Sequence, residues 1–334
     1  MQQPRTRQRR SVLGLAASVL AVTAAFGVAS PARAQDPYPS RPISLVVGFP
    51  PGGSNDMVAR IIAPRLGELL GTSVIVVNKP GSNALIGTDF VTRAAPDGYT
   101  LTLASASPLV ISPNTYAKMP FDPVKDLTGI TTVAATPELI AVHPSVPART
   151  LGELVELSRK KQVTLSSSGN GGLPHLAIEL LRTASKGDFL HVPYKGAGPA
   201  VTDTVGGHVN GVIMDLPALQ ALVKEGKLRP LAITNQQRSP VLPQTPTSGE
   251  EGFPSVLAFN WFAVLGPAGL PKPILDKLHK ALLDTVATPQ VREAMLKIGV
   301  EPMTHASPQA YAAFMRDELQ RWGKVARESG ARAD

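Results

Sequence analysis

The stretch VVGFPPGGSNDMVAR, residues 46–60, decides how this chain folds. An apolar run over residues 43–49 stops at two prolines, passes two glycines and continues into apolar residues at helical spacing. The order predicts a strand, a glycine loop and a helix N-terminus. Such a junction directs unpaired backbone N–H groups and the positive end of the helix dipole at one place. We therefore expect the loop to bind an anionic group, as half of a carboxylate pocket. The expected apolar stripe of the helix is Val58, Ile61, Ile62, Leu66, Leu69 and Leu70.

Two other interpretations of this loop are open. Glycine and proline after a strand are also ordinary turn residues. The spacing from Gly48 to Ser54 follows GxxxxGS, as in a nucleotide P-loop, but the lysine that contacts the phosphates is missing. The sequence thus disfavours triphosphate binding.

The first 34 residues are typical of a cleaved export signal. Four arginines precede an apolar stretch over residues 12–28, and Ala32-Arg33-Ala34 forms an A-x-A cleavage site. A membrane anchor is the alternative, but the stretch is short for a span and holds several Gly, Ser and Thr residues. The paired arginines resemble a twin-arginine signal, and Sec export is also open. We expect a periplasmic mature protein without a membrane span.

Composition limits the function classes. The signal holds five arginines and no acidic residue, so without it the net charge of +8 falls to +3. Nothing in this balance points to nucleic acid. The chain has no cysteine, which excludes disulfides, thiolate metal sites and cysteine nucleophiles. Few aromatic and many aliphatic residues predict an aliphatic α/β core.

Strand and helix patterns alternate through the first part of the mature sequence. Strands are expected at residues 43–49, 74–77 and 99–104, with a helix near 86–95 between the last two. This βαβαβ order predicts a parallel sheet, in which ligands bind beyond the carboxyl ends of the strands. The loops at residues 49–56, 78–84 and 105–114 should therefore face one crevice.

A second α/β domain is expected after a crossing segment at residues 127–143. That segment has two apolar runs, 130–135 and 139–142, separated by Pro137-Glu138. Thr150 and Glu153 form a capping box that opens a helix to about residue 160. A second strand–glycine–helix junction follows, with strand 163–167, loop SSSGNGGLPH and helix 176–184. The remaining expected units are strand 189–192, loop PYKGAG, helix 199–205, strand 211–214, helix 218–225 and strand 231–234.

The chain then returns to the first domain. Residues 236–255 are rich in Pro, Ser and Thr and are predicted to be the return linker. A strand at 261–265 should complete one sheet, and helices are expected at 271–286 and 290–298. The last helix begins with Ser307 as cap and Pro308 at its first position, and should pack on the first domain.

The sequence gives little support for an enzyme. The sequence has no GxSxG, HExxH or GxGxxG motif in a fitting context. Ser166, Ser167 and Ser168 lie near His175, so a secreted serine hydrolase is an alternative, although such serines more often cap helices or donate hydrogen bonds. Zinc through His175 and His191 would need a third ligand that the sequence does not offer. We expect no catalytic residue, no metal and no cofactor.

Three charged residues could contact a ligand. Lys195, between Tyr194 and Gly196 in a loop after a strand, could meet an anion or remain solvated. Asp56 lies in a first helical turn, where its role could be limited to a favourable interaction with the helix dipole. Alternatively, it could accept a hydrogen bond from a ligand amine or hydroxyl. Asp215, directly after a strand, has the same two interpretations.

Several motifs in order resemble one family. They are RPISLVVGFPPGGSNDMVAR, VVNKPGSNALIG, APDGYTL, HVPYKGAGPAVTDTVGGHV, EGKLRPLAIT and the terminal pattern through Trp322. Together they resemble the Bug-type (TctC-like) substrate-binding receptors of tripartite tricarboxylate transporters, over residues 38–330. The resemblance implies a bilobed α/β fold like that of type II periplasmic binding proteins. Lobe 1 would comprise residues 35–138 and 256–334, and lobe 2 residues 139–255.

The resemblance also implies the function and the site. It implies a monomer that binds a small carboxylate between the lobes and delivers it to membrane permease subunits, or alternatively reports it to a sensor kinase. Ligands of such receptors are di- and tricarboxylates, acidic amino acids and aromatic acids. Candidate ligand-binding residues of the first lobe are Phe49, Gly52, Gly53, Ser54, Asn55, Asp56, Ser82, Asn83, Ala84, Ser105 and Ser107. Those of the second lobe are Ser167, Ser168, Gly169, Asn170, Gly171, His175, Tyr194, Lys195, Gly196 and Asp215.

The sequence departs from the family pattern in two loops. Relatives commonly read PGAGG where this chain has Pro80-Gly81-Ser82-Asn83-Ala84. The third loop has Leu109 and Val110 where a more polar stretch is usual. A ligand with an apolar or aromatic portion would fit these two residues.

Overall fold

The computed structural model describes residues 38–333, and from Pro39 onward the chain forms one compact unit. The expected signal segment and its cleavage site lie outside this range. Within the described residues, no helix combines the length and apolarity that a membrane crossing needs.

The first βαβαβ unit is confirmed. Strands β1 (Ile43–Val47), β2 (Val74–Asn78) and β3 (Thr100–Ser105) are parallel, in the order β2-β1-β3. Helix α2 (Ser54–Leu70) follows β1, and α3 (Leu85–Thr92) follows β2. The spacing of apolar residues explains α2, because Val58, Ile62 and Leu66 are fully buried, whereas Leu69 is exposed against expectation.

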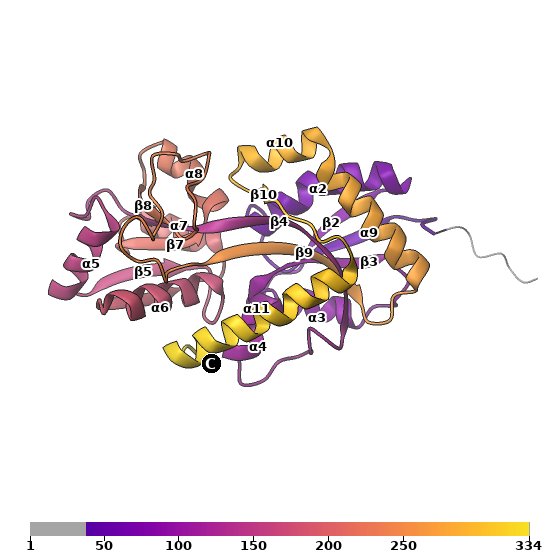
Figure 1. Cartoon of the computed structure of the whole chain (residues 1–334), viewed down its shortest axis with the longest axis horizontal. Helices are drawn as coiled ribbons and strands as arrows, with labels where there is room; N and C mark the ends of the chain where they lie inside the picture. Colours follow the sequence, from indigo (N-terminus) through magenta and orange to yellow (C-terminus); the bar gives the residue numbers. More distant parts are fainter. Residues whose placement is uncertain (1–37, 334) are drawn as a thin grey trace, which may run out of the picture. The chain divides into compact units, whose positions relative to one another are not determined.

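One long strand joins the two halves of the sheet. The crossing segment was predicted as two apolar runs, but it forms a single strand, β4 (Leu127–Val142). Up to Pro137 it pairs with β9 (Phe259–Pro267), and from Glu138 onward with β7 and β8. Figure 1 shows β4 and β9 running side by side. Proline is tolerated here because the ladder changes partner at this point.

The second half repeats the strand–helix alternation. Thr150 caps α5 as predicted, by accepting from the Glu153 backbone N–H. The alternation of strands and helices in both halves confirms the α/β fold class. The boundaries of the two lobes stay a prediction. The elements are α5 (Leu151–Lys160), β5 (Val163–Ser167), α6 (Leu173–Ser185), β6 (Phe189–Pro193), α7 (Ala197–Val205), β7 (Gly211–Asp215), α8 (Leu216–Lys224) and β8 (Arg229–Ile233).

The C-terminal elements return to the first half. Helices α9 (Lys272–Ala287) and α10 (Pro289–Lys297) pack with α2 on one face of the sheet, and α3 and α11 (Pro308–Ser329) lie on the other (Figure 1). A short strand, β10 (Glu301–Pro302), pairs with β4. Helix α11 contacts β4 as expected, but it also contacts α6 of the second half. Its Ser307 cap accepts from the Ala310 backbone N–H.

The loop expected at residues 105–114 is instead helical. It contains a π-helical turn, η1 (Ser107–Ile111), followed by α4 (Ser112–Thr115). Its apolar side chains provide the reason, since Leu109 and Val110 are fully buried in the core. These two residues therefore cannot contact a ligand in the way the sequence indicated.

Candidate functional site

The site is built around the N-terminus of α2. Gly53 precedes the helix in an extended conformation without a side-chain cap, so the first-turn N–H groups keep their hydrogen-bonding capacity. Gly52 has φ +84, a left-handed conformation that glycine adopts without strain. Ser54 and Asn55 follow directly and are buried. The local sequence thus creates a glycine turn that leads directly into the uncapped helix N-terminus.

Asp56 fixes the shape of this loop. Its carboxylate accepts from the Gly52 N–H at 3.0 Å, from Arg60 Nε at 2.9 Å and from Asn78 Nδ2 at 3.0 Å. Burial alone would raise the pKa of Asp56, but these hydrogen bonds outweigh it and hold the pKa below its usual value. Both oxygens are thus engaged by the protein, and Asp56 lines neither of the cavities described below.

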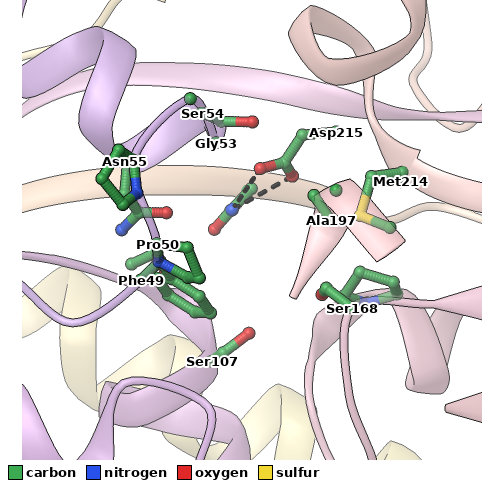
Figure 2. A pocket seen from close by; sticks show the side chains of 16 residues that line it. Phe49, Pro50, Gly53, Ser54, Asn55, Ser107, Ser168, Ala197, Met214 and Asp215 are labelled. Carbon is green, nitrogen blue, oxygen red and sulfur yellow. Dashed lines mark hydrogen bonds between the residues drawn. The ribbon is translucent and has the colours of Figure 1, made fainter. Parts of the chain in front are cut away.

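A first cavity of about 300 Å³ lies in front of the α2 N-terminus. Figure 2 shows that its walls come from both halves of the sheet, with Asn55 on one side and Asp215 on another. The lining residues are Phe49, Pro50, Pro51, Gly52, Gly53, Ser54, Asn55, Ser105, Ser107, Ser168, Pro174, Ala197, Gly198, Met214, Asp215 and Asn260.

Two buried donors in this cavity have no partner among the described residues. They are the amide nitrogen Nδ2 of Asn55 and the hydroxyl of Ser105. Ser107 is different, because its hydroxyl accepts from the Leu173 N–H at the start of α6. Buried polar groups are nearly always hydrogen-bonded, so donors left over in a cavity indicate a polar ligand.

Asp215 and Asn260 lie together in the same cavity. Asn260 Nδ2 donates to both oxygens of Asp215, each at 3.1 Å (Figure 2, dashed lines). Burial raises the pKa of Asp215, and hydrogen bonding to Glu138, Ser54 and Asn260 opposes this effect. Asp215 also begins α8, so its predicted helix-dipole role and a ligand contact are compatible.

A second cavity of about 550 Å³ adjoins the first. The two share Phe49, Pro50 and Ser168. Lys195 lines the second cavity and is exposed. The Tyr194 hydroxyl donates to Asp203 at 2.6 Å, which raises the pKa of Tyr194 to about 12. The other lining residues are Pro80, Gly81, Ser82, Asn83, Ala84, Ile86, Tyr116, Gly169, Asn170 and Gly196.

Two stacked histidines lie behind the second glycine loop. The rings of His175 and His191 are 3.9 Å apart, and His175 Nδ1 accepts from the Gly171 N–H. Burial lowers the pKa of His175 to about 4 and that of His191 to about 3. At neutral pH both are therefore uncharged, and the 3.7 Å approach of His175 to Glu179 is not an ion pair.

The hydrolase geometry does not form in the cavities. Ser167 reaches His191 Nε2 at 2.6 Å, but Ser167 is fully buried and lines neither cavity. Ser168, which lines both, has no histidine partner in the described part of the chain. No group of three potential metal-binding side chains occurs within residues 38–333.

The structure brings most predicted site residues to the two cavities. Four lie outside the lining: Asp56, Ser167, Gly171 and His175. Asp56, Ser167 and His175 are engaged in hydrogen bonds that shape the loops. Several lining residues were not predicted from the sequence, among them Asn260, Met214, Pro174 and Tyr116. A polar residue directly before the apolar run 261–265 was the available signal for Asn260.

Comparisons with known proteins agree with this architecture. Residues 58–331 match the model of the tripartite tricarboxylate transporter family receptor. Protein BugT of Bordetella pertussis is 37% identical over 312 residues, which cover 92% of this chain and 95% of BugT.

Solved structures of similar sequence have the same fold. A Rhodopseudomonas palustris protein with adipate is 33% identical, with a TM-score of 0.85 over 88% of this chain and 99% of that one. MatC from Rhodopseudomonas palustris with bound malate is 27% identical, with a TM-score of 0.80 over 86% of this chain and 99% of MatC. The chain therefore belongs to the tripartite tricarboxylate transporter family receptors, a family of periplasmic solute-binding proteins.

Proposed function

We propose that this protein is an extracytoplasmic receptor that captures a small carboxylate in the first cavity. It then delivers this ligand to the membrane permease subunits of a tripartite tricarboxylate transporter. Capture requires hydrogen-bond donors and a route for release, and it requires no nucleophile.

One observation supports the proposal most strongly: two buried donors that have no partner among the residues the structure describes lie beside an uncapped helix N-terminus. Asn55 Nδ2 and the Ser105 hydroxyl line the first cavity together with the first turn of α2. A carboxylate would accept from these side chains and from the backbone N–H groups, and the helix dipole would favour its charge. The adipate and malate named for the two Rhodopseudomonas palustris proteins are small carboxylates of this kind.

The test compares two buried hydroxyls that differ in position. Ser105 and Ser112 are both fully buried, and neither hydroxyl has a hydrogen-bond partner within residues 38–333, but only Ser105 lines the cavity. A hydrogen bond to a charged group contributes about 1.5–3 kcal/mol, so Ser105→Ala and Asn55→Ala should each weaken a carboxylate roughly tenfold or more. Ser112→Ala should leave the affinity unchanged.

Isothermal titration calorimetry against a panel of organic acids provides the measurement. If both cavity variants bind the acid as tightly as the unmodified protein, the proposed pocket is wrong. Delivery is tested separately, by uptake of the identified acid in cells that carry the permease subunits with and without this receptor. Equal uptake in both would refute delivery and leave capture standing.

A further inference from the structure

Behind the first cavity, two acidic residues face each other across neighbouring strands. Glu138 on β4 is paired in register with Asp215 at the end of β7. Antiparallel partners project to the same face of a sheet, so the two carboxyl groups are neighbours. Glu138 is completely buried, and Asp215 is 9% exposed. Only Asp215 lines the cavity.

The surroundings of the two groups are unequal. Glu138 has a side-chain hydrogen bond with Asp215, and no other group in the described part of the chain bonds to its carboxyl oxygens. Burial, followed by the charge of Asp215, raises the pKa of Glu138 well above its usual value. Two adjacent buried carboxyl groups cannot both ionise at low cost, so the proton resides on Glu138. Asp215 is then the charged member of the pair.

The orientation of Asn260 supports this assignment. Its Oδ1 accepts from the Ala106 N–H at 3.3 Å, which fixes the amide so that Nδ2 faces Asp215. Asp215 therefore acts as an acceptor toward Asn260. Asp215 also has side-chain hydrogen bonds with Glu138 and Ser54, so it is held in place at the cavity wall.

The cavity therefore has two ends of opposite character. Asn55 and Ser105 offer donors that have no partner in the described part of the chain, whereas Asp215 presents a carboxylate. Asp215 and Asn55 lie on different sides of the cavity (Figure 2). A ligand group without a donor or a positive charge would not compensate the charge of Asp215, and a second carboxylate placed there would be repelled.

We propose that Asp215 selects, among small organic acids, those with a hydrogen-bond donor on the carbon chain beside the carboxylate, either an ammonium or a hydroxyl group. The ammonium should bind more tightly, since it also neutralises the charge of Asp215. Because Glu138 is neutral, the pair of carboxyl groups carries a single negative charge, which is on Asp215. This inference rests on the proposed capture of a carboxylate and specifies the class of acid.

The experiment uses acids that share a skeleton and differ in one group. Propionate, lactate and alanine form one series, and succinate, malate and aspartate form another, with hydrogen, hydroxyl and ammonium at the same carbon. Calorimetry on the unmodified protein should place the ammonium acid first in the series that binds, at least roughly tenfold ahead of the unsubstituted acid. This ranking needs no variant, so it is informative even if a substitution impairs folding.

Variants then assign the selection to Asp215. Asp215→Asn, of nearly the same shape, should reduce the gap between ammonium and unsubstituted acids to less than about threefold. Glu138→Gln, which copies the neutral acid, should keep the ranking, and Ser112→Ala should do the same.

The outcomes separate the two claims. If the unsubstituted acids bind as tightly as their amino and hydroxy partners, or if Asp215→Asn keeps the full gap, the selection is refuted and carboxylate capture stands. If no acid in a wider panel binds at all, both claims are refuted.

Discussion

At the residue scale, Asp56 is a carboxylate with a structural role beside the proposed carboxylate site. It accepts from Gly52, Arg60 and Asn78 and so holds the glycine loop in place. The sequence left open whether Asp56 favours the helix dipole or contacts a ligand. Asn78 of β2 lies next to Asp56 only in the folded chain, so no local sequence pattern predicts that contact.

Replacing Asp56 by Asn should therefore destabilise the protein. An amide cannot accept from all three donors, and the N–H of Gly52 would lose its charged partner. We expect the free energy of unfolding in urea to fall by about 1–3 kcal/mol, together with weaker carboxylate binding. Asp89→Asn is the matched control, because Asp89 forms a similar i,i+4 pair with Arg93 at the surface. That change should cost less than about 1 kcal/mol. Equal effects of the two substitutions would contradict the structural role of Asp56.

At the element scale, the spacing of apolar residues predicted the strands and helices that bury one face in the core. It gave the wrong structure where contacts between distant elements determine the conformation. Pro137-Glu138 looks like a break in the sequence, yet β4 continues through it because each half finds its own partners. Pro108 favours a turn, but burial of Leu109 and Val110 stabilises η1. Asn260 was missed for a related reason, since its role depends on β9 lying beside β3 and β4.

His175 on α6 stacks on His191 on β6, and we expect this pair to make the second glycine loop sensitive to acid. The unfolded chain binds protons on histidine near pH 6.5, whereas His175 and His191 resist protonation until about pH 4 and about pH 3. Between these values the unfolded state holds more protons, so stability falls as the pH drops from about 6.5 towards 4. Each histidine contributes up to about 1.4 kcal/mol per pH unit.

Urea unfolding between pH 4.5 and pH 7 measures this dependence. His191→Gln should remove about one proton from the slope of stability against pH. His208→Gln, at an exposed position, is the control and should leave the slope unchanged. An unaltered slope in the His191 variant would show that the stacked pair is not the acid-sensitive element.

At the scale of the whole molecule, loops from the two halves of the sheet meet around the cavities. The Asn83 side chain donates to the Asn170 carbonyl and, at 3.2 Å, to the Tyr116 hydroxyl. Thr115 donates to the Gly171 carbonyl at 3.0 Å. The parallel topology let the sequence predict which loops face the cavity, but not which of their side chains bond to one another.

These contacts should slow the release of the ligand. Asn83→Ala removes a hydrogen bond between the loops, worth about 1 kcal/mol, and should speed dissociation roughly fivefold with little change in association. Stopped-flow measurements with the identified acid would detect this, with Ser112→Ala as control. An unchanged dissociation rate would mean that Asn83 does not hold the loops together around the ligand.

The proposed function requires that the first cavity bind a carboxylate through donors that have no partner in the described part of the chain. Its most direct test is calorimetric titration with an organic acid found in the panel and with the neutral amide of the same acid, on the unmodified protein and on Ser105→Ala. We expect the acid to bind, the amide to bind at least roughly tenfold more weakly, and Ser105→Ala to weaken binding of the acid. Equal affinity for acid and amide, together with an unaffected Ser105 variant, would contradict it.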